Sequence, residues 1–287
     1  MSRPAMYYVK NKDMKVQCFL CPHNCVITPG KLGLCRTRKN IDGELYSLNY
    51  GKVTSIALDP IEKKPLYRFH PGKLILSAGT FGCNLKCPFC QNWTIAHDDP
   101  GTVEITPQQL VKNAEKYIQQ GNIGIAYTYN EPSIWYEFVY ETSMLAREKG
   151  MVNVLVTNGF INREPLENLL PFIDAMNIDV KAFNHSFYKD ICKGSLGNVM
   201  KTVEIASDKC HVEVTTLIVP GLNDSMEEVD GMARWLASVS PEITLHLSRF
   251  FPHYRMEGIP PTPLETLQNA RDRALKHLMY VHVGNVR

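Results

Sequence analysis

Short apolar runs rich in β-branched residues recur along the chain after residue 72, and longer stretches with helical spacing separate them. Runs of this length, bounded by turn residues, are typical of buried strands. The predicted strands are 73–78, 123–129, 152–157, 173–181, 211–219, 243–248 and 279–286. Strands that alternate with helices in this way predict a parallel sheet joined by right-handed crossovers.

Cap residues mark where the intervening helices begin. Thr106-Pro107 and Thr262-Pro263 each place a capping hydroxyl before a proline, and Ser133 and Ser225 are expected to cap two more helices. The expected helices are 106–121, 133–150, 163–170, 197–207, 225–238 and 262–278. No glycine-rich dinucleotide-binding segment follows any strand, so the pattern favours an α/β fold of the full or partial (β/α) TIM-type barrel class.

The first 72 residues have a different character. Residues 41–58 alternate as strands do, and Asn49-Tyr50-Gly51 predicts a hairpin between two of them. The prolines of 59–72 disfavour regular structure and indicate a linker over the barrel, unless Lys63 and Lys64 face a ligand. We therefore expect a cysteine-rich metal-binding module with its linker at 1–72 and the barrel at 73–287.

Composition excludes several classes of function. The 287 residues are 44% hydrophobic and carry a net charge of +2, which gives no electrostatic case for a nucleic acid partner. No apolar run reaches the roughly 18 residues that span a bilayer, and the N-terminus lacks a signal-peptide core. We expect a cytoplasmic protein without a membrane partner.

Seven of the nine cysteines fall into two tight groups. In a chain without an export signal, such groups indicate metal sites and not disulfides. Cys192 and Cys210 stand alone, and we interpret both as inert thiols.

The first group can surround a single ion or cluster. Its members are Cys18, Cys21, Cys25 and Cys35. So short a segment has little core of its own, and a bound metal would supply much of its folding free energy. Zinc and a 4Fe–4S cluster both accept four thiolates, so a structural zinc site and an electron-relay cluster both remain open.

The second group has the spacing C-x3-C-x2-C over Cys83, Cys87 and Cys90, with Phe89 before the last cysteine. Three thiolates are one too few for a closed four-cysteine site. On a four-iron cluster they would leave one iron open to an outside ligand. A zinc loop or unrelated core thiols are the alternative.

This segment resembles the signature of radical S-adenosylmethionine (SAM) enzymes. The resemblance implies a 4Fe–4S cluster at the three cysteines, with SAM chelating the open iron through its amino and carboxylate groups. It further implies that an electron splits SAM into methionine and a 5′-deoxyadenosyl radical, which takes a hydrogen atom from the substrate. Phe89 would then pack near the adenine, and a flavodoxin or ferredoxin would be the expected electron donor.

Two strand ends carry polar residues that extend this resemblance. Asn130-Glu131 follows strand 123–129 and resembles the glycine-glycine-glutamate segment that holds the methionine amino group, although Tyr129 and Asn130 replace the glycines. Glu131 can instead cap the next helix. Strand 152–157 ends in Thr157-Asn158, which is similar to a segment near the SAM ribose in pyruvate formate-lyase activating enzyme.

Asp179 and Lys181 end strand 173–181 on the same face. In the activating enzymes a matching Asp-x-Lys contacts SAM, so Lys181 would reach the carboxylate and Asp179 a ribose or amino group. Thr215 stands where those enzymes have an arginine, which puts that contact in doubt. His246 is a candidate for a catalytic group facing the cavity, or else a core histidine with a satisfied partner.

Taken together, the motifs look like the AmmeMemoRadiSam branch of the superfamily, which is similar to the activating enzymes of glycyl radical enzymes. The expected function is reductive SAM cleavage followed by hydrogen abstraction. The substrate would be a protein glycine or a small molecule. A non-catalytic zinc-binding interaction protein is the alternative from another class.

Overall fold

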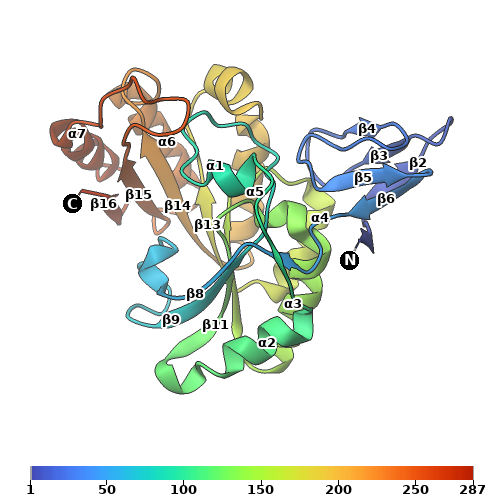
Figure 1. The fold of residues 1–287 in the computed structure, drawn as a ribbon. Helices are drawn as coiled ribbons and strands as arrows, with labels where there is room; N and C mark the ends of the chain where they lie inside the picture. The colour runs from blue at the N-terminus through green and yellow to red at the C-terminus, as the bar shows by residue number, and fades with distance from the viewer. Residues whose placement is uncertain (1, 287) are drawn as a thin grey trace.

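The computed structural model describes residues 2–286, and an eight-stranded sheet forms its centre (Figure 1). The strand order is β16-β15-β14-β13-β12-β11-β9-β8. Neighbours are parallel except β8, which runs antiparallel to β9. The bounds are β8 Ser55–Pro60, β9 Leu74–Gly79, β11 Asn122–Tyr127, β12 Val152–Thr157, β13 Ala175–Asp179, β14 His211–Ile218, β15 Thr244–Arg249 and β16 Val281–Gly284. The seven predicted strands are confirmed, and because β8 and β16 are not paired with each other, the barrel is partial.

Helices connect the parallel strands and match the predicted positions. They are α2 Pro107–Glu115, α3 Tyr136–Glu148, α4 Arg163–Leu169, α5 Leu196–Ser207, α6 Met226–Val239 and α7 Leu264–Ala274. Shorter elements are α1 Trp93–Ala96, η1 Ile61–Lys63, η2 Ile118–Gln120, η3 Pro132–Trp135, η4 Leu170–Phe172 and the π-helical turn η5 Phe187–Cys192. In the part of the chain that is described, no helix combines the length and apolar character that crossing a membrane requires.

The caps were partly predicted. Thr106 forms a capping box with Gln109, and Ser225 accepts a hydrogen bond from the Glu228 amide. The prediction for Ser133 was wrong, because Glu131 caps η3 and accepts the Ser133 amide at 2.9 Å. The prediction for Thr262 was also wrong, because its hydroxyl accepts the Phe250 amide and α7 begins two residues later.

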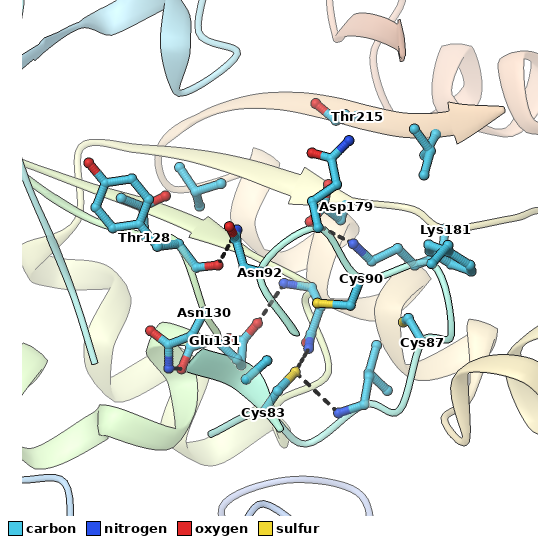
Figure 2. A pocket seen from close by; sticks show the side chains of 18 of the residues that line it. Cys83, Cys87, Cys90, Asn92, Thr128, Asn130, Glu131, Asp179, Lys181 and Thr215 are labelled. Atoms are coloured by element: carbon cyan, nitrogen blue, oxygen red, sulfur yellow. Dashed lines mark hydrogen bonds and ion pairs between the residues drawn. The ribbon is translucent and has the colours of Figure 1, made fainter. Parts of the chain in front are cut away.

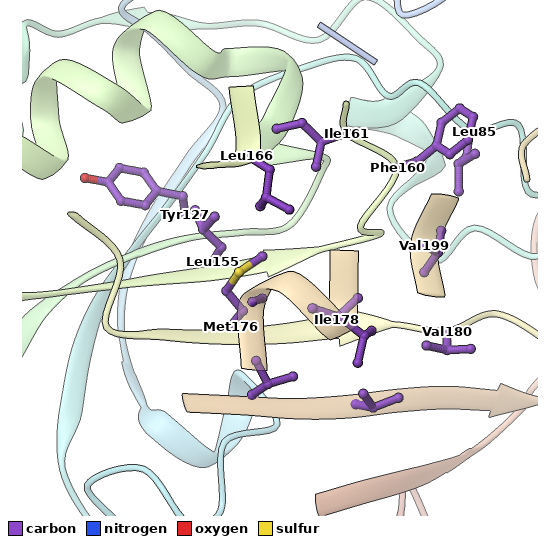
Figure 3. Close-up of a cluster of buried hydrophobic side chains, with 14 of the residues drawn as sticks. Leu85, Tyr127, Leu155, Phe160, Ile161, Leu166, Met176, Ile178, Val180 and Val199 are labelled. Atoms are coloured by element: carbon purple, nitrogen blue, oxygen red, sulfur yellow. The ribbon is translucent and has the colours of Figure 1, made fainter. Parts of the chain in front are cut away.

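The core lies between the sheet and the helices that cover it (Figure 3). Leu155, Met176 and Ile178 lie on adjacent strands, and Leu166 of α4 and Val199 of α5 belong to the same buried cluster. Each such side chain stabilises the fold by about 1.5–3 kcal/mol when it leaves water. This packing fixes the ends of β12 and β13, where polar residues follow.

The N-terminal strands form two small sheets that project from the main body (Figure 1). One contains β1 Arg3–Pro4, β6 Glu44–Ser47 and β5 Arg38–Ile41, and the other contains β2 Tyr8–Lys10, β3 Val16–Cys18 and β4 Val26–Ile27. The hairpin predicted at 49–51 is wrong. The turn lies at Asp42-Gly43, and β7 Lys52–Val53 pairs instead with β10 Val103–Glu104.

Buried contacts join these sheets to the barrel. Arg38 and Glu137 of α3 form an ion pair at 2.8 Å, and both side chains are almost fully buried. Ser55–Pro60, which includes the start of the expected linker, is a strand that pairs with β9 along its whole length. The division of the chain into two domains at residue 72 stays a prediction. One strand before that boundary, β8, belongs to the main sheet.

Candidate active site

A cavity of about 320 Å³ lies where the carboxyl ends of the parallel strands meet. Polar groups of such sheets gather at this edge because every strand points the same way. Nine of the side chains predicted to hold the cluster or SAM line it: Cys83, Cys87, Phe89, Cys90, Asn130, Glu131, Asn158, Asp179 and Lys181. Figure 2 shows the three cysteines and the Asp179–Lys181 pair around the same space.

The three cysteines lie on the loop between β9 and α1. Two groups point hydrogen-bond donors at the Cys83 sulfur, the Leu85 amide at 3.4 Å and the Asn158 side-chain amide at 3.6 Å. Burial raises the pKa of Cys83 well above its usual value, and burial raises that of Cys90 to about 11. These thiols therefore need a nearby cation before they ionise.

A fourth thiol, Cys192, lies beside the loop, and its contact with Cys87 was not predicted from the sequence. It is fully buried at the end of η5, and its hydrogen bond with Cys87 is the largest influence raising the pKa of Cys87. Its carbonyl also accepts the Lys86 amide at 2.8 Å. A spacing of 105 residues from Cys87 carries no local signal of this contact.

Glu131 is buried, and protein donors already engage both of its oxygens. One accepts the Ser133 amide and the Thr157 hydroxyl at 2.9 and 2.6 Å, and the other accepts the Asn158 amide at 2.8 Å. Burial raises its pKa despite these bonds. Glu131 thus ties the end of β11 to the end of β12, and Thr157 lies behind it, outside the set of residues that line the cavity.

Asp179 and Lys181 form an ion pair at 2.8 Å within the cavity. Burial lowers the pKa of Lys181, but the charge of Asp179 and the hydrogen bond to it act in the opposite direction, and the pKa is raised overall. The ammonium is therefore charged. Thr215, from the adjacent β14, lines the same wall.

His246 is not brought together with these residues. Its Nε2 lies 2.6 Å from a carboxylate oxygen of Glu213, and its ring packs edge-on against Tyr67. It is 5% exposed and is absent from the cavity lining. His246 lies early in β15, away from the strand's carboxyl end, which corresponds to the alternative of a core histidine with a partner.

Lys63 and Lys64 do line the cavity, together with Tyr129. Lys64 bonds Asp59 at 2.9 Å, and the Tyr129 hydroxyl donates to the same carboxylate oxygen at 2.9 Å. Tyr129 has a positive φ of 73°, which is uncommon for a bulky residue. The sequence left the role of the two lysines open, and it gave no sign of Asp59.

The N-terminal cysteines gather around a small cavity of their own. Cys18, Cys21, Cys25 and Cys35 all line it, with Arg38 beside them. Burial, and then the neighbouring thiols, raise the pKa of Cys21 to about 12. Within residues 2–286, no three His, Cys, Asp or Glu side chains are arranged so that they could hold a metal ion, here or at the loop of Cys83.

Comparison with known families identifies the barrel. A model described as the radical SAM superfamily matches residues 78–236, just over half of the chain. The chain belongs to the radical SAM superfamily. The matched region contains Cys83, Cys87 and Cys90, whereas the N-terminal cysteines and His246 lie outside it.

Individual relatives show which members of the radical SAM superfamily this chain resembles. An uncharacterised protein of Methanocaldococcus jannaschii is 47% identical over 99% of this chain and 85% of its own length. The indoleacetate decarboxylase activating enzyme of Tractidigestivibacter scatoligenes is 27% identical over 66% of this chain, and the chain spans 59% of that enzyme. A domain of pyruvate formate-lyase activating enzyme from Bacteroides vulgatus has a TM-score of 0.50 at 14% identity, covering 56% of this chain and 98% of that domain, which shows the shared fold.

These findings confirm the predicted α/β fold of the barrel and the enzyme class, whereas the N-terminal metal-binding module stays a prediction. The protein is a radical SAM enzyme related to the activating enzymes of glycyl radical enzymes. Its assignment to the AmmeMemoRadiSam branch stays a prediction.

Proposed function

We propose that this radical SAM enzyme binds a 4Fe–4S cluster at Cys83, Cys87 and Cys90 and cleaves SAM reductively. The observation that carries the proposal is the shared cavity. Three thiols, the Asn158 amide and the Asp179–Lys181 pair line one space at the carboxyl ends of successive strands.

The residues at the loop fit such a cluster by their chemistry. Thiolates are its usual protein ligands, and the two amide donors at Cys83 suit a charged sulfur. Binding would require the cysteine side chains to rotate toward a common centre, since they are not yet arranged as a metal site. When bound, the cluster supplies the electron that splits SAM.

The remaining lining residues are proposed to hold SAM. Lys181 uses one N–H on Asp179, so its other N–H groups can bind the SAM carboxylate. Asp179 can accept from the amino group or ribose. Asn130, Glu131 and Asn158 form the wall between β11 and β12, and Thr157 supports Glu131 from behind. Phe89, packed against Phe187, offers an apolar face for the adenine.

The proposed substrate is a glycine of a partner protein. The name of the activating-enzyme relative supports this choice. A flavodoxin or ferredoxin is the proposed electron donor, and free thiols at all nine cysteines accord with a cytoplasmic site.

The N-terminal cysteines are proposed to hold a second metal, zinc or an iron–sulfur cluster. Their common cavity supports this, and so does Arg38, whose Nε is buried without a hydrogen-bond partner among the described residues. A guanidinium beside four thiolates offsets part of their charge.

Metal content tests both sites. After anaerobic reconstitution with iron and sulfide, Cys83→Ala is expected to lose about four iron atoms per chain and SAM binding, because a four-iron cluster loses a ligand. Cys210→Ala is the control, since Cys210 lines neither cavity. Iron and acid-labile sulfide retained in full by Cys83→Ala would contradict the assignment.

The second site is tested by Cys21→Ala. We expect this variant to lose either zinc or a second set of iron while it keeps the spectrum of the Cys83 site. Elemental analysis of the purified protein decides between the two metals. Unchanged metal content in Cys21→Ala would remove the second site from the account.

A further inference from the structure

A second lysine–aspartate pair lies against the same cavity. Lys64 follows η1 and is 3% exposed, and its Nζ lies 2.9 Å from Asp59. The ammonium also lies 4.7 Å from the centre of the Tyr129 ring. Both Lys64 and Tyr129 line the cavity.

The Asp59 carboxylate accepts more hydrogen bonds than the Lys64 ammonium donates. Asp59 accepts from three donors, Lys63 at 3.3 Å, Lys64 at 2.9 Å and the Tyr129 hydroxyl at 2.9 Å. Lys64 has three N–H groups, and Asp59 is the one acceptor that the described residues give it. A buried ammonium with unused donors is costly unless a ligand or water accepts them.

Tyr129 is held firmly in this arrangement. Asn92 donates to its carbonyl at 2.6 Å, and a Cβ at Gly79 would lie 2.8 Å from its ring. Residue 79 must therefore lack a side chain for the Tyr129 ring to lie where it does. Such support fixes Asp59 and, through it, the direction of the Lys64 ammonium.

Three lysines line the cavity, but the Lys63 side chain is 67% exposed, so Lys64 and Lys181 are the two whose ammonium groups are largely enclosed and have spare donors. Lys181 extends from the end of β13, and Lys64 follows β8 at the sheet's edge. SAM carries a single anionic group, its carboxylate, and the proposed function assigns that group to Lys181. Lys64 is left for a second anion.

We propose that Lys64 binds a carboxylate of the substrate and so selects a substrate with an acidic group beside its reacting hydrogen. This inference rests on the proposed function only in taking the cavity as the place where SAM and substrate meet. Asp59 already neutralises much of the ammonium charge, which favours a singly charged carboxylate over a doubly charged phosphate. The carboxylate can belong to a glutamate or aspartate near a peptide glycine, or to a small organic acid.

The experiment uses the reconstituted protein with its cluster and SAM bound and no reductant. Calorimetry compares a capped glycine–glutamate–glycine peptide with its glutamine counterpart, and acetate with acetamide. We expect one carboxylate probe to bind at least tenfold more tightly than its neutral partner. A preference for the carboxylate in the peptide pair alone indicates a protein substrate. A preference for acetate over acetamide alone indicates a small organic acid.

Substitutions of Lys64 then test whether this residue causes the preference for a carboxylate. Lys64→Met is expected to abolish it and Lys64→Arg to restore part of it, with the affinity for SAM unchanged in both. Asp59 keeps Lys63 and Tyr129 as partners, so the fold should tolerate the change. Lys73→Met is the control, since it removes the same charge from an exposed position outside the cavity. Lys64→Gln replaces the methionine variant if the latter melts early.

Three results would overturn the inference. They are a wild-type protein without preference for either carboxylate, a Lys64→Met protein that keeps the preference, and a Lys64→Met protein whose main loss is in SAM affinity. Formation of 5′-deoxyadenosine, measured in parallel after dithionite is added, reports separately on the proposed function. Carboxylate preference without that product would leave Lys64 as a binding residue and refute the radical chemistry.

Discussion

Glu131 and Glu213 are both buried carboxylates, and their surroundings drive their pKa values in opposite directions. At Glu131 burial dominates and raises the pKa. Burial also acts to raise the pKa of Glu213, but hydrogen bonds from His211, His246 and two backbone amides outweigh it and bring the pKa to about 2. Glu213 is therefore charged at neutral pH and holds the Tyr67–Arg68 segment to β14.

Replacing Glu213 with glutamine tests this reading. A carboxylate with a lowered pKa stabilises the fold fully above its unfolded pKa of about 4.3, and that contribution is lost as the pH falls toward 2. Glu213→Gln is expected to lower the free energy of unfolding by roughly 2 kcal/mol at pH 7, because a buried donor then faces other donors. Urea unfolding between pH 7 and pH 3.5 measures the difference.

The wild type and the variant should converge as the pH falls below about 4.3. Glu242→Gln is the control, since Glu242 is exposed on the loop before β15. A difference between wild type and Glu213→Gln that stays constant over this range would contradict a charged Glu213.

At the residue scale, the sequence predicted what local spacing encodes. The cysteine loop and the Asp179–Lys181 pair are short motifs, and their side chains line the cavity as expected. The contact of Cys192 with Cys87 depends on tertiary packing, so no sequence pattern predicts it. Lys64 and Asp59 are only five residues apart, but the prolines of 59–72 indicated a linker and gave no sign of η1, the turn that lies between them. The sequence left two interpretations of His246, a cavity residue and a core histidine with a partner, because a strand's period does not tell how far along the strand a cavity reaches. Its contact with Glu213 and its absence from the cavity lining favour the second.

At the element scale, apolar periodicity predicted all seven parallel strands. For β8 the alternation over residues 41–58 indicated a strand, but it did not predict the antiparallel pairing with β9, because that partner lies some 20 residues later in the chain. The hairpin at 49–51 failed for the same reason, because β7 finds its partner in β10. Ser133 was predicted as the cap because serine is a preferred residue at helix N-termini. Propensity does not take account of the Glu131 carboxylate, which accepts the Ser133 amide together with two donors from β12 and the residue after it.

The loop after β9 depends on one glycine. Gly82 has a φ of 88°, and a Cβ there would lie 2.7 Å from the Cys35 carbonyl oxygen and 2.6 Å from Thr37. Gly82→Ala is therefore expected to lose about 2 kcal/mol or more of stability and to reduce iron loading, since both the backbone and the contact with the N-terminal strands must shift. Thermal unfolding and iron analysis measure the two effects.

Gly101→Ala is the matched control. Its φ lies outside the positive range, and a Cβ there would meet nothing within 4 Å. Equal stability and equal iron content in the two variants would show that the loop does not depend on close approach at Gly82.

At the scale of the whole molecule, the N-terminal sheets and the barrel meet beside the proposed cluster loop. Arg38 links them through Glu137, and Gly82 packs on the backbone of Cys35. The family match, over residues 78–236, covers the barrel from the end of β9 into α6 and none of the N-terminal sheets. The central claim therefore concerns the barrel, and it is that the cavity at the strand ends cleaves SAM.

Formation of 5′-deoxyadenosine measures this claim most directly. The protein is reconstituted anaerobically with iron and sulfide, and SAM and dithionite are added. The account predicts 5′-deoxyadenosine and methionine in equal amounts from the wild type and from Cys210→Ala, and none from Cys83→Ala. Intact SAM after incubation with a wild-type protein that carries a reduced cluster and binds SAM would contradict the account.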